Sequence, residues 1–154
     1  MPTLQDNLDS MIRPRSILLF ERLFLASLLL WCVLQAMTWD YRVALLATNA
    51  ILATPAAAMA TVVLAILAVS VAVWYFVARR SSRIAKRAAV ALAVCSAITF
   101  IFGLIAIGQP GLPGPTIKLL SVAVSALCVA AAVPLFRPDA KTWFGEDTIG
   151  VTIE

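Results

Sequence analysis

The side chains that most often carry catalysis or bind metals are sparse in this sequence. It contains no histidine, which removes the commonest metal ligand, the usual axial ligand of haem and the commonest general base. Three cysteines, Cys32, Cys95 and Cys128, lie far apart without a CxxC pair. Free cysteines in apolar helices mostly serve as small packing residues, and a redox pair would need two of them within disulfide distance. The sequence therefore predicts no catalytic residue, no metal site and no cofactor.

Two adjacent charged residues, Glu21 and Arg22, form a candidate polar pair inside an otherwise apolar stretch. Ionisable groups inside a bilayer are costly, so they mark functional positions by default. Neighbours on a helix point about 100° apart and cannot face each other well. One hypothesis gives each a partner elsewhere, with Glu21 accepting from a basic residue between Arg79 and Arg87. In the alternative, both side chains extend to lipid headgroups.

The densest charge lies in the nine residues RRSSRIAKR. One interpretation is topological, because a basic loop stays on the cytoplasmic side of a membrane. The other is contact with anionic lipid headgroups, to which each cation contributes about 1 kcal/mol. A short turn next to the membrane does not favour nucleic-acid binding. The candidate headgroup contacts are Arg79, Arg80, Arg83, Lys86 and Arg87.

The amino-acid composition indicates which secondary-structure elements position these residues. Of the 154 residues, 62% are apolar and 13% charged, whereas soluble domains have about 45 to 50% and about 25%. Charge disappears over four stretches, each long enough to cross a bilayer as a helix. The sequence predicts an all-α integral membrane protein with four transmembrane helices in an antiparallel bundle. Its domain, residues 16–137, has spans at about 17–39, 55–78, 88–107 and 117–136, between a cytoplasmic segment 1–15 and a cytoplasmic tail 138–154.

Orientation follows from lysine and arginine. Ten of the twelve occur before or at the start of the first span, between spans two and three, or after span four; only Arg42 and Lys118 lie on the other side. This asymmetry predicts both termini in the cytoplasm. A short interfacial helix is expected at 41–54 on the outer side, with an irregular loop as the alternative. Asp139 is expected to cap a short turn that brings Trp143 and Phe144 onto the inner surface.

Small residues predict how the spans pack, because helices in lipid associate where their backbones approach closely. Span two carries a stripe of small residues in steps of four and three, and spans three and four carry similar stripes. This favours a tight core of spans two to four. Span one, rich in Leu, Phe and Trp, is expected to pack loosely at the periphery or to offer its face to another protein or another copy. The candidate packing residues are Thr61, Ala65, Ala68, Ala72, Ala89, Ala93, Ala97, Ser121 and Ser125.

Three stretches carry a resemblance to a known group. These are RPRSILLFERLFLASLL (Arg13 to Leu29), the WD of Trp39 and Asp40, and RPDAKTWF (Arg137 to Phe144). Together they resemble small uncharacterised four-span inner-membrane proteins of Gram-negative bacteria. The resemblance implies the same four-span fold and a multi-pass protein of the bacterial inner, or cytoplasmic, membrane. It implies no activity.

Two functions remain open at this point. The first is a non-catalytic accessory or assembly protein that acts through helix-helix contacts, with itself as a homo-oligomer or with a larger membrane complex. The second is a small oligomeric channel or transporter for a small solute. Its path would be lined by Ser70, Ser96, Thr99, Ser121 and Ser125.

Overall fold

The computed structural model describes residues 14–48, 54–107, 109 and 114–145. The helices are α2 (Arg15–Met37), α3 (Trp39–Ala47), α4 (Pro55–Arg80), α5 (Arg83–Ile107), α6 (Pro115–Ala132), the 3-10 helix η1 (Val133–Phe136) and α7 (Pro138–Trp143). Four stretches are long and apolar enough to cross a membrane: α2, α4, α5, and α6 continued by η1. The chain is therefore a multi-pass membrane protein with an all-α four-span bundle, as predicted.

Some predictions fall on positions outside the described residues. Most of the expected cytoplasmic segment 1–15 and the last nine residues of the expected tail belong here. The same holds for residues 49–53 of the expected interfacial stretch and for most of the turn between spans three and four. Before that gap, α3 forms a short helix directly after α2, which confirms a helix between spans one and two.

The segment between spans two and three differs from its prediction as a basic loop. Helix α4 continues to Arg80 and α5 begins at Arg83, so only Ser81 and Ser82 connect them. Ser81 turns the chain with a positive φ of 44°, and the Ser82 N–H donates to the carbonyl of Phe76 at 3.2 Å. Arginine, lysine and alanine are good helix formers, and no proline or glycine interrupts them. The basic residues therefore stand on the ends of two helices.

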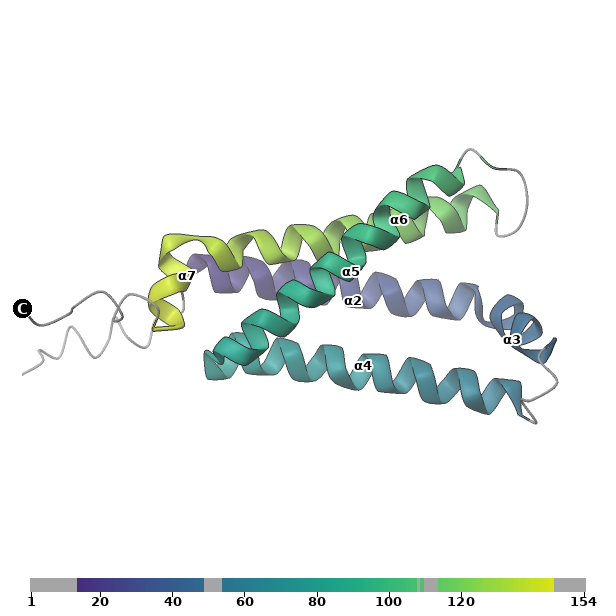
Figure 1. Ribbon diagram of the computed structural model, residues 1–154, viewed down its shortest axis with the longest axis horizontal. Helices are drawn as coiled ribbons and strands as arrows, with labels where there is room; N and C mark the ends of the chain where they lie inside the picture. Colours follow the sequence, from purple (N-terminus) through teal and green to yellow (C-terminus); the bar gives the residue numbers. More distant parts are fainter. Residues whose placement is uncertain (1–13, 49–53, 108, 110–113, 146–154) are drawn as a thin grey trace, which may run out of the picture.

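Helix α2 runs through the middle of the bundle (Figure 1). Its most extensive contacts are with α6, and it also packs against α4, η1 and α7. Helix α5 crosses from the end of α4 to the far part of α6, its main partner. We call the end with the Ser81–Ser82 turn and α7 the basic end, and the end with α3 the far end. Because α2 contacts α4 and α6, the prediction that span one is peripheral is wrong.

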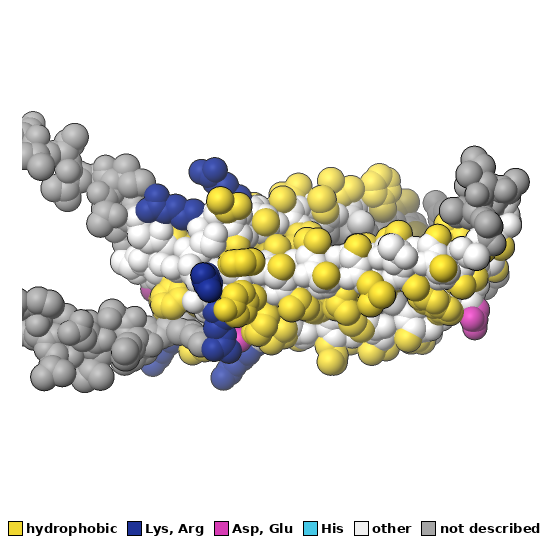
Figure 2. Space-filling view, turned by 90° about the horizontal axis from the view of Figure 1, so that it is seen from below, with side chains coloured by type: hydrophobic (Ala, Val, Ile, Leu, Met, Phe, Trp, Pro, Cys, Tyr) yellow, Lys and Arg dark blue, Asp and Glu magenta, His cyan; other side chains and the backbone are white. Residues whose placement is uncertain are grey.

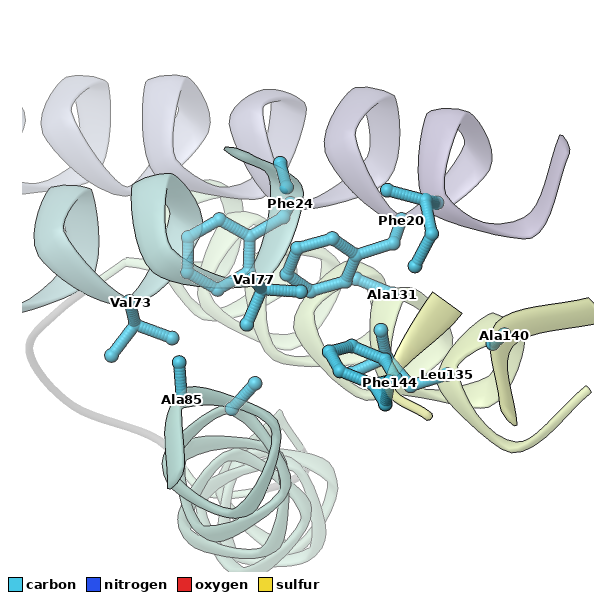
Figure 3. Packing of buried hydrophobic residues seen from close by; sticks show 12 residues of the cluster. Phe20, Phe24, Val73, Val77, Ala85, Ala131, Leu135, Ala140 and Phe144 are labelled. Atoms are coloured by element: carbon cyan, nitrogen blue, oxygen red, sulfur yellow. The ribbon is translucent and has the colours of Figure 1, made fainter. Parts of the chain in front are cut away.

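The hydrophobic core lies at the basic end (Figure 3). The rings of Phe20 and Phe24 stack with centroids 5.3 Å apart and point from α2 toward Val77 of α4 and Ala131 of α6. Large aromatic side chains bury much apolar area where helices pack together. Helix α2 therefore packs against α6 and joins the core through its bulky side chains.

Candidate functional site

Charged side chains and their contacts are concentrated at the basic end (Figure 2). Lysine and arginine side chains gather there, and apolar side chains cover the length of the bundle beyond it. Glu21 of α2 and Arg79 of α4 form an ion pair with 3.9 Å between oxygen and nitrogen. Arg79 also lies over the ring of Trp74, 6.0 Å from its centroid. Glu21 thus has a partner among the basic residues that follow span two, as one of the two hypotheses stated.

Asp139 joins the start of the bundle to its last described helix. Its Oδ2 accepts a hydrogen bond of 3.2 Å from the backbone N–H of Ser16. Helix α2 has no side-chain cap at Pro14, so Asp139 satisfies one of the N–H groups that any helix start leaves unpaired. Helix α7 has no side-chain cap at Arg137. The Asp139 carboxyl thus caps α2, and it also accepts hydrogen bonds from backbone N–H groups in the first turn of α7, where the sequence predicted a cap.

The surroundings of Asp139 at these helix starts shift the pKa of its carboxyl. Desolvation raises the pKa of the carboxyl, but hydrogen bonds from Ser16 and from the first turn of α7 outweigh it. The pKa therefore lies below the usual value for an aspartate. Helix starts carry partial positive charge, and Asp139 stands at two of them, so both favour the charged form.

Helix α7 is held from its other side by α4 and α5. Arg83 Nε donates to the carbonyl of Phe144 at 2.9 Å, and the same guanidinium donates to the carbonyl of Gly145. Trp143 Nε1 donates to the carbonyl of Val77 at 3.3 Å. The Phe144 side chain is buried in the core. The last described helix is therefore docked onto three others.

Some of the five residues predicted to contact lipid headgroups interact with protein groups instead. Arg79 and Arg83 bind protein groups, and the Lys86 ammonium lies 5.1 Å from the ring centroid of Phe144. Arg80 and Arg87 are exposed on the ends of α4 and α5. Three of the five thus help to assemble the basic end, although Arg79 and Arg83 remain exposed.

A separate cationic cavity, which the sequence analysis missed, lies on the α2 side of the basic end. It measures about 300 Å³ and is lined by Arg15, Leu18, Leu19, Arg22 and Arg137. The seven-residue spacing of Arg15 and Arg22 places both on one face of α2 and could have signalled half of this site. Nothing in the sequence brings Arg137 to them. Arg22 therefore lies with other arginines, while Glu21 pairs with Arg79.

Two further cavities follow each other along the bundle. One of about 310 Å³ at the far end is lined by both far-side cations, Arg42 and Lys118, and by Ser121. The other, about 130 Å³, lies at mid-bundle and is lined by residues of all four spans, including Ser70 and Ser96. On α5 and α6, the hydroxyl oxygens of Thr99 and Ser125 stand 3.2 Å apart.

The predicted packing residues divide into two groups. On α5 and α6, Ala89, Ala93 and Ser125 are buried, and Ala97 and Ser121 are half-buried, in agreement with close packing of these helices. The stripe of α4 differs. All four of its members are exposed, so it makes no tight contact within the described chain: Thr61, Ala65, Ala68 and Ala72.

The exposure of this stripe follows from the path of α5. Helices α4 and α5 meet at the basic end and diverge toward the far end (Figure 1). Where they separate, an apolar groove of about 380 Å³ is lined by Ala72, Phe76, Ile84 and Ala88 among others. The stripe of α4 leads into this groove through Ala72. The prediction of a tight core of spans two to four therefore fails at α4.

The three cysteines are all free, two of them exposed and Cys128 half-buried. Comparison with known proteins adds no assignment: no family model, curated protein or solved structure matches the chain.

Proposed function

We propose that this protein is a non-catalytic accessory or assembly protein of a membrane, acting through contacts between spanning helices. The supporting observation is the small-residue stripe of α4, exposed along its length. In lipid, small residues are favoured where helices approach closely, since a face without bulky side chains makes poor contact with acyl chains. Steps of four, three and four residues follow the heptad spacing of left-handed helix pairs. The stripe therefore suits an incoming helix.

The groove between α4 and α5 supports the same proposal. It is apolar, it lies at the basic end of the stripe, and alanines from both helices line it. A partner helix seated on the stripe would end in this groove. The partner we test first is a second copy of the chain, because one heptad stripe can pair with itself about a two-fold axis.

The experiment measures the mass of the complex in mild detergent or nanodiscs. The variant Ala68→Leu with Ala72→Leu places two bulky side chains on the stripe. Its matched control, Ala126→Leu with Ala130→Leu, makes the same change at two exposed alanines of α6. We expect the native chain and the control to form a dimer or larger complex, and the α4 variant to be monomeric. A native protein that is strictly monomeric and carries no partner would contradict the proposal.

Transport has less support from the geometry. The two cavities with the predicted serines reach from the far end to mid-bundle. Toward the basic end, Ile17, Phe20, Phe24 and Val77 fill the interior. The cavities thus form no path through the described part of a single chain. A channel would have to run between chains of an oligomer. The absence of solute flux in liposomes that contain the protein would refute the channel hypothesis.

For the location, we propose a bacterial inner membrane with the basic end in the cytoplasm. The support is the ten-to-two distribution of lysine and arginine and the resemblance noted above. Accessibility of single introduced cysteines to a membrane-impermeant thiol reagent, in a chain without its three native cysteines, tests this orientation. Labelling from the outside should occur near Arg42 and not near Ser81.

A further inference from the structure

The cavity on the α2 side of the basic end combines three guanidinium groups with an apolar wall. Arg15 and Arg22 are separated by seven residues, about 10 Å along the helix, with Leu18 and Leu19 between them. Arg137 joins them from the junction of η1 and α7. All three arginines are exposed, and so are both leucines. The cavity thus offers positive charge beside a surface that faces lipid.

No carboxylate lines this cavity. The two acidic residues described at this end are engaged elsewhere, Glu21 with Arg79 and Asp139 with Ser16. Three like charges around one space repel one another, and an anion placed among them relieves that repulsion. The three positive charges therefore favour binding of an anion in this cavity. Among the described residues, no carboxylate of the chain lines the cavity to take that place.

The position in the membrane indicates what that ligand is. Arg15 and Arg22 belong to the first two turns of a spanning helix, where the headgroup layer of a bilayer meets its hydrocarbon. Guanidinium groups bind phosphate oxygens through paired hydrogen bonds. We propose that this cavity binds the phosphate of an anionic phospholipid, with the acyl chains lying along Leu18 and Leu19. This inference does not depend on the assembly proposed above.

The site differs from the rest of the basic end. Arg79, Arg83 and Lys86 are bound to protein groups, and Arg80 and Arg87 do not line the cavity. Cations spread over a surface attract anionic lipid diffusely, whereas three arginines around one cavity select a single phosphate. Retention of a defined lipid by the purified protein distinguishes the two cases.

The test uses the full chain in detergent, with retained lipid counted by native mass spectrometry. The probes are phosphatidylglycerol, phosphatidylcholine and inorganic phosphate, each added separately. The site variant is Arg15→Gln, Arg22→Gln and Arg137→Gln combined. The matched control removes the same charge from the same end outside the cavity: Arg80→Gln, Arg87→Gln and Lys141→Gln.

We expect the native chain to retain phosphatidylglycerol and not phosphatidylcholine. The site variant should bind it about 100-fold more weakly, about fivefold for each arginine lost, and the control should stay close to native. Equal retention by the site variant and the native chain would overturn the proposal, and so would an equal loss in the control. Displacement of the lipid by inorganic phosphate would also overturn it, because the site would then take the free anion. Unchanged thermal melting shows that the site variant is folded.

Discussion

Replacing Phe144 by alanine is expected to release α7 from the bundle. The Phe144 side chain is 4% exposed and belongs to the core at the basic end. Burial of such a ring contributes about 1.5 to 3 kcal/mol, and alanine would also leave a cavity. An undocked α7 stays near the membrane interface, where part of the ring remains out of water. We therefore expect Phe144→Ala to reduce the free energy of docking by about 2 kcal/mol. This shifts the equilibrium between docked and undocked α7 about 30-fold toward the undocked state.

Hydrogen exchange of the backbone amides, followed by mass spectrometry on the intact chain, measures this release. In the docked helix the Phe144 N–H donates to the Ala140 carbonyl, and the Gly145 N–H to the Thr142 carbonyl. These amides should exchange about 30-fold faster in Phe144→Ala, because local opening sets their protection. Amides of α2 should keep their native rates apart from those of its first turn, which Asp139 contacts.

Phe136→Ala is the matched control, since its side chain lies nearby and is 59% exposed. A surface change of this kind shifts stability by about 0.5 kcal/mol or less, so exchange should change about twofold at most. Equal acceleration in both variants would refute the argument from burial. A fall in melting temperature of the whole bundle in Phe144→Ala, without selective exchange in α7, would show that Phe144 holds the bundle and not α7 alone.

Two other predictions concern single contacts. The pKa of Asp139 is lowered in the folded chain, so its contribution to docking is complete above the unfolded pKa of about 3.9 and lost as the pH falls through the folded value. Protection of α7 amides, corrected for intrinsic rates, should stay constant from about pH 8 to about pH 5 and fall below about pH 4, whereas Asp139→Asn should lack this acid transition; the same transition in both would contradict the assignment. At Gly103, an added Cβ would stand 2.8 Å from Val122 Cγ2. Overpacking costs about 1 to 3 kcal/mol, against about 1 kcal/mol gained from helix propensity, so Gly103→Ala should lower the melting temperature by a few degrees and the further change Val122→Ala should restore it. Absence of such rescue would show that the α5–α6 spacing does not depend on this glycine.

The four spans could be predicted because the bilayer imposes length and apolarity on each helix separately. Even Glu21 and Arg22 did not conceal the first span, which runs from Arg15 to Met37. The basic segment was predicted as a loop because charge marks the limits of a span, yet charge does not end a helix. Arginine and lysine continue α4 and begin α5 until the chain turns at Ser81.

Contacts between helices could be predicted only in part. The stripes of α5 and α6 identified a real interface, but small residues on one helix do not specify which other helix covers them. That is why the stripe of α4 was assigned to the wrong partners. The core around Phe20 and Phe24 could not be predicted, because it depends on how three helices are arranged in space. The sequence of any one helix does not specify that arrangement. The meeting of Arg137 with Arg15 and Arg22 depends in the same way on how the chain returns.

The hydrogen bond between Asp139 and Ser16 joins residues 123 positions apart. During synthesis, the start of α2 reaches the membrane well before α7 exists, so its Ser16 amide must first bond to water or to lipid headgroups. Only when all four spans have been made does the carboxylate that replaces those bonds appear. The contact of α7 with the start of α2 therefore forms only after all four spans have been made, and it marks a chain whose four-span bundle is assembled.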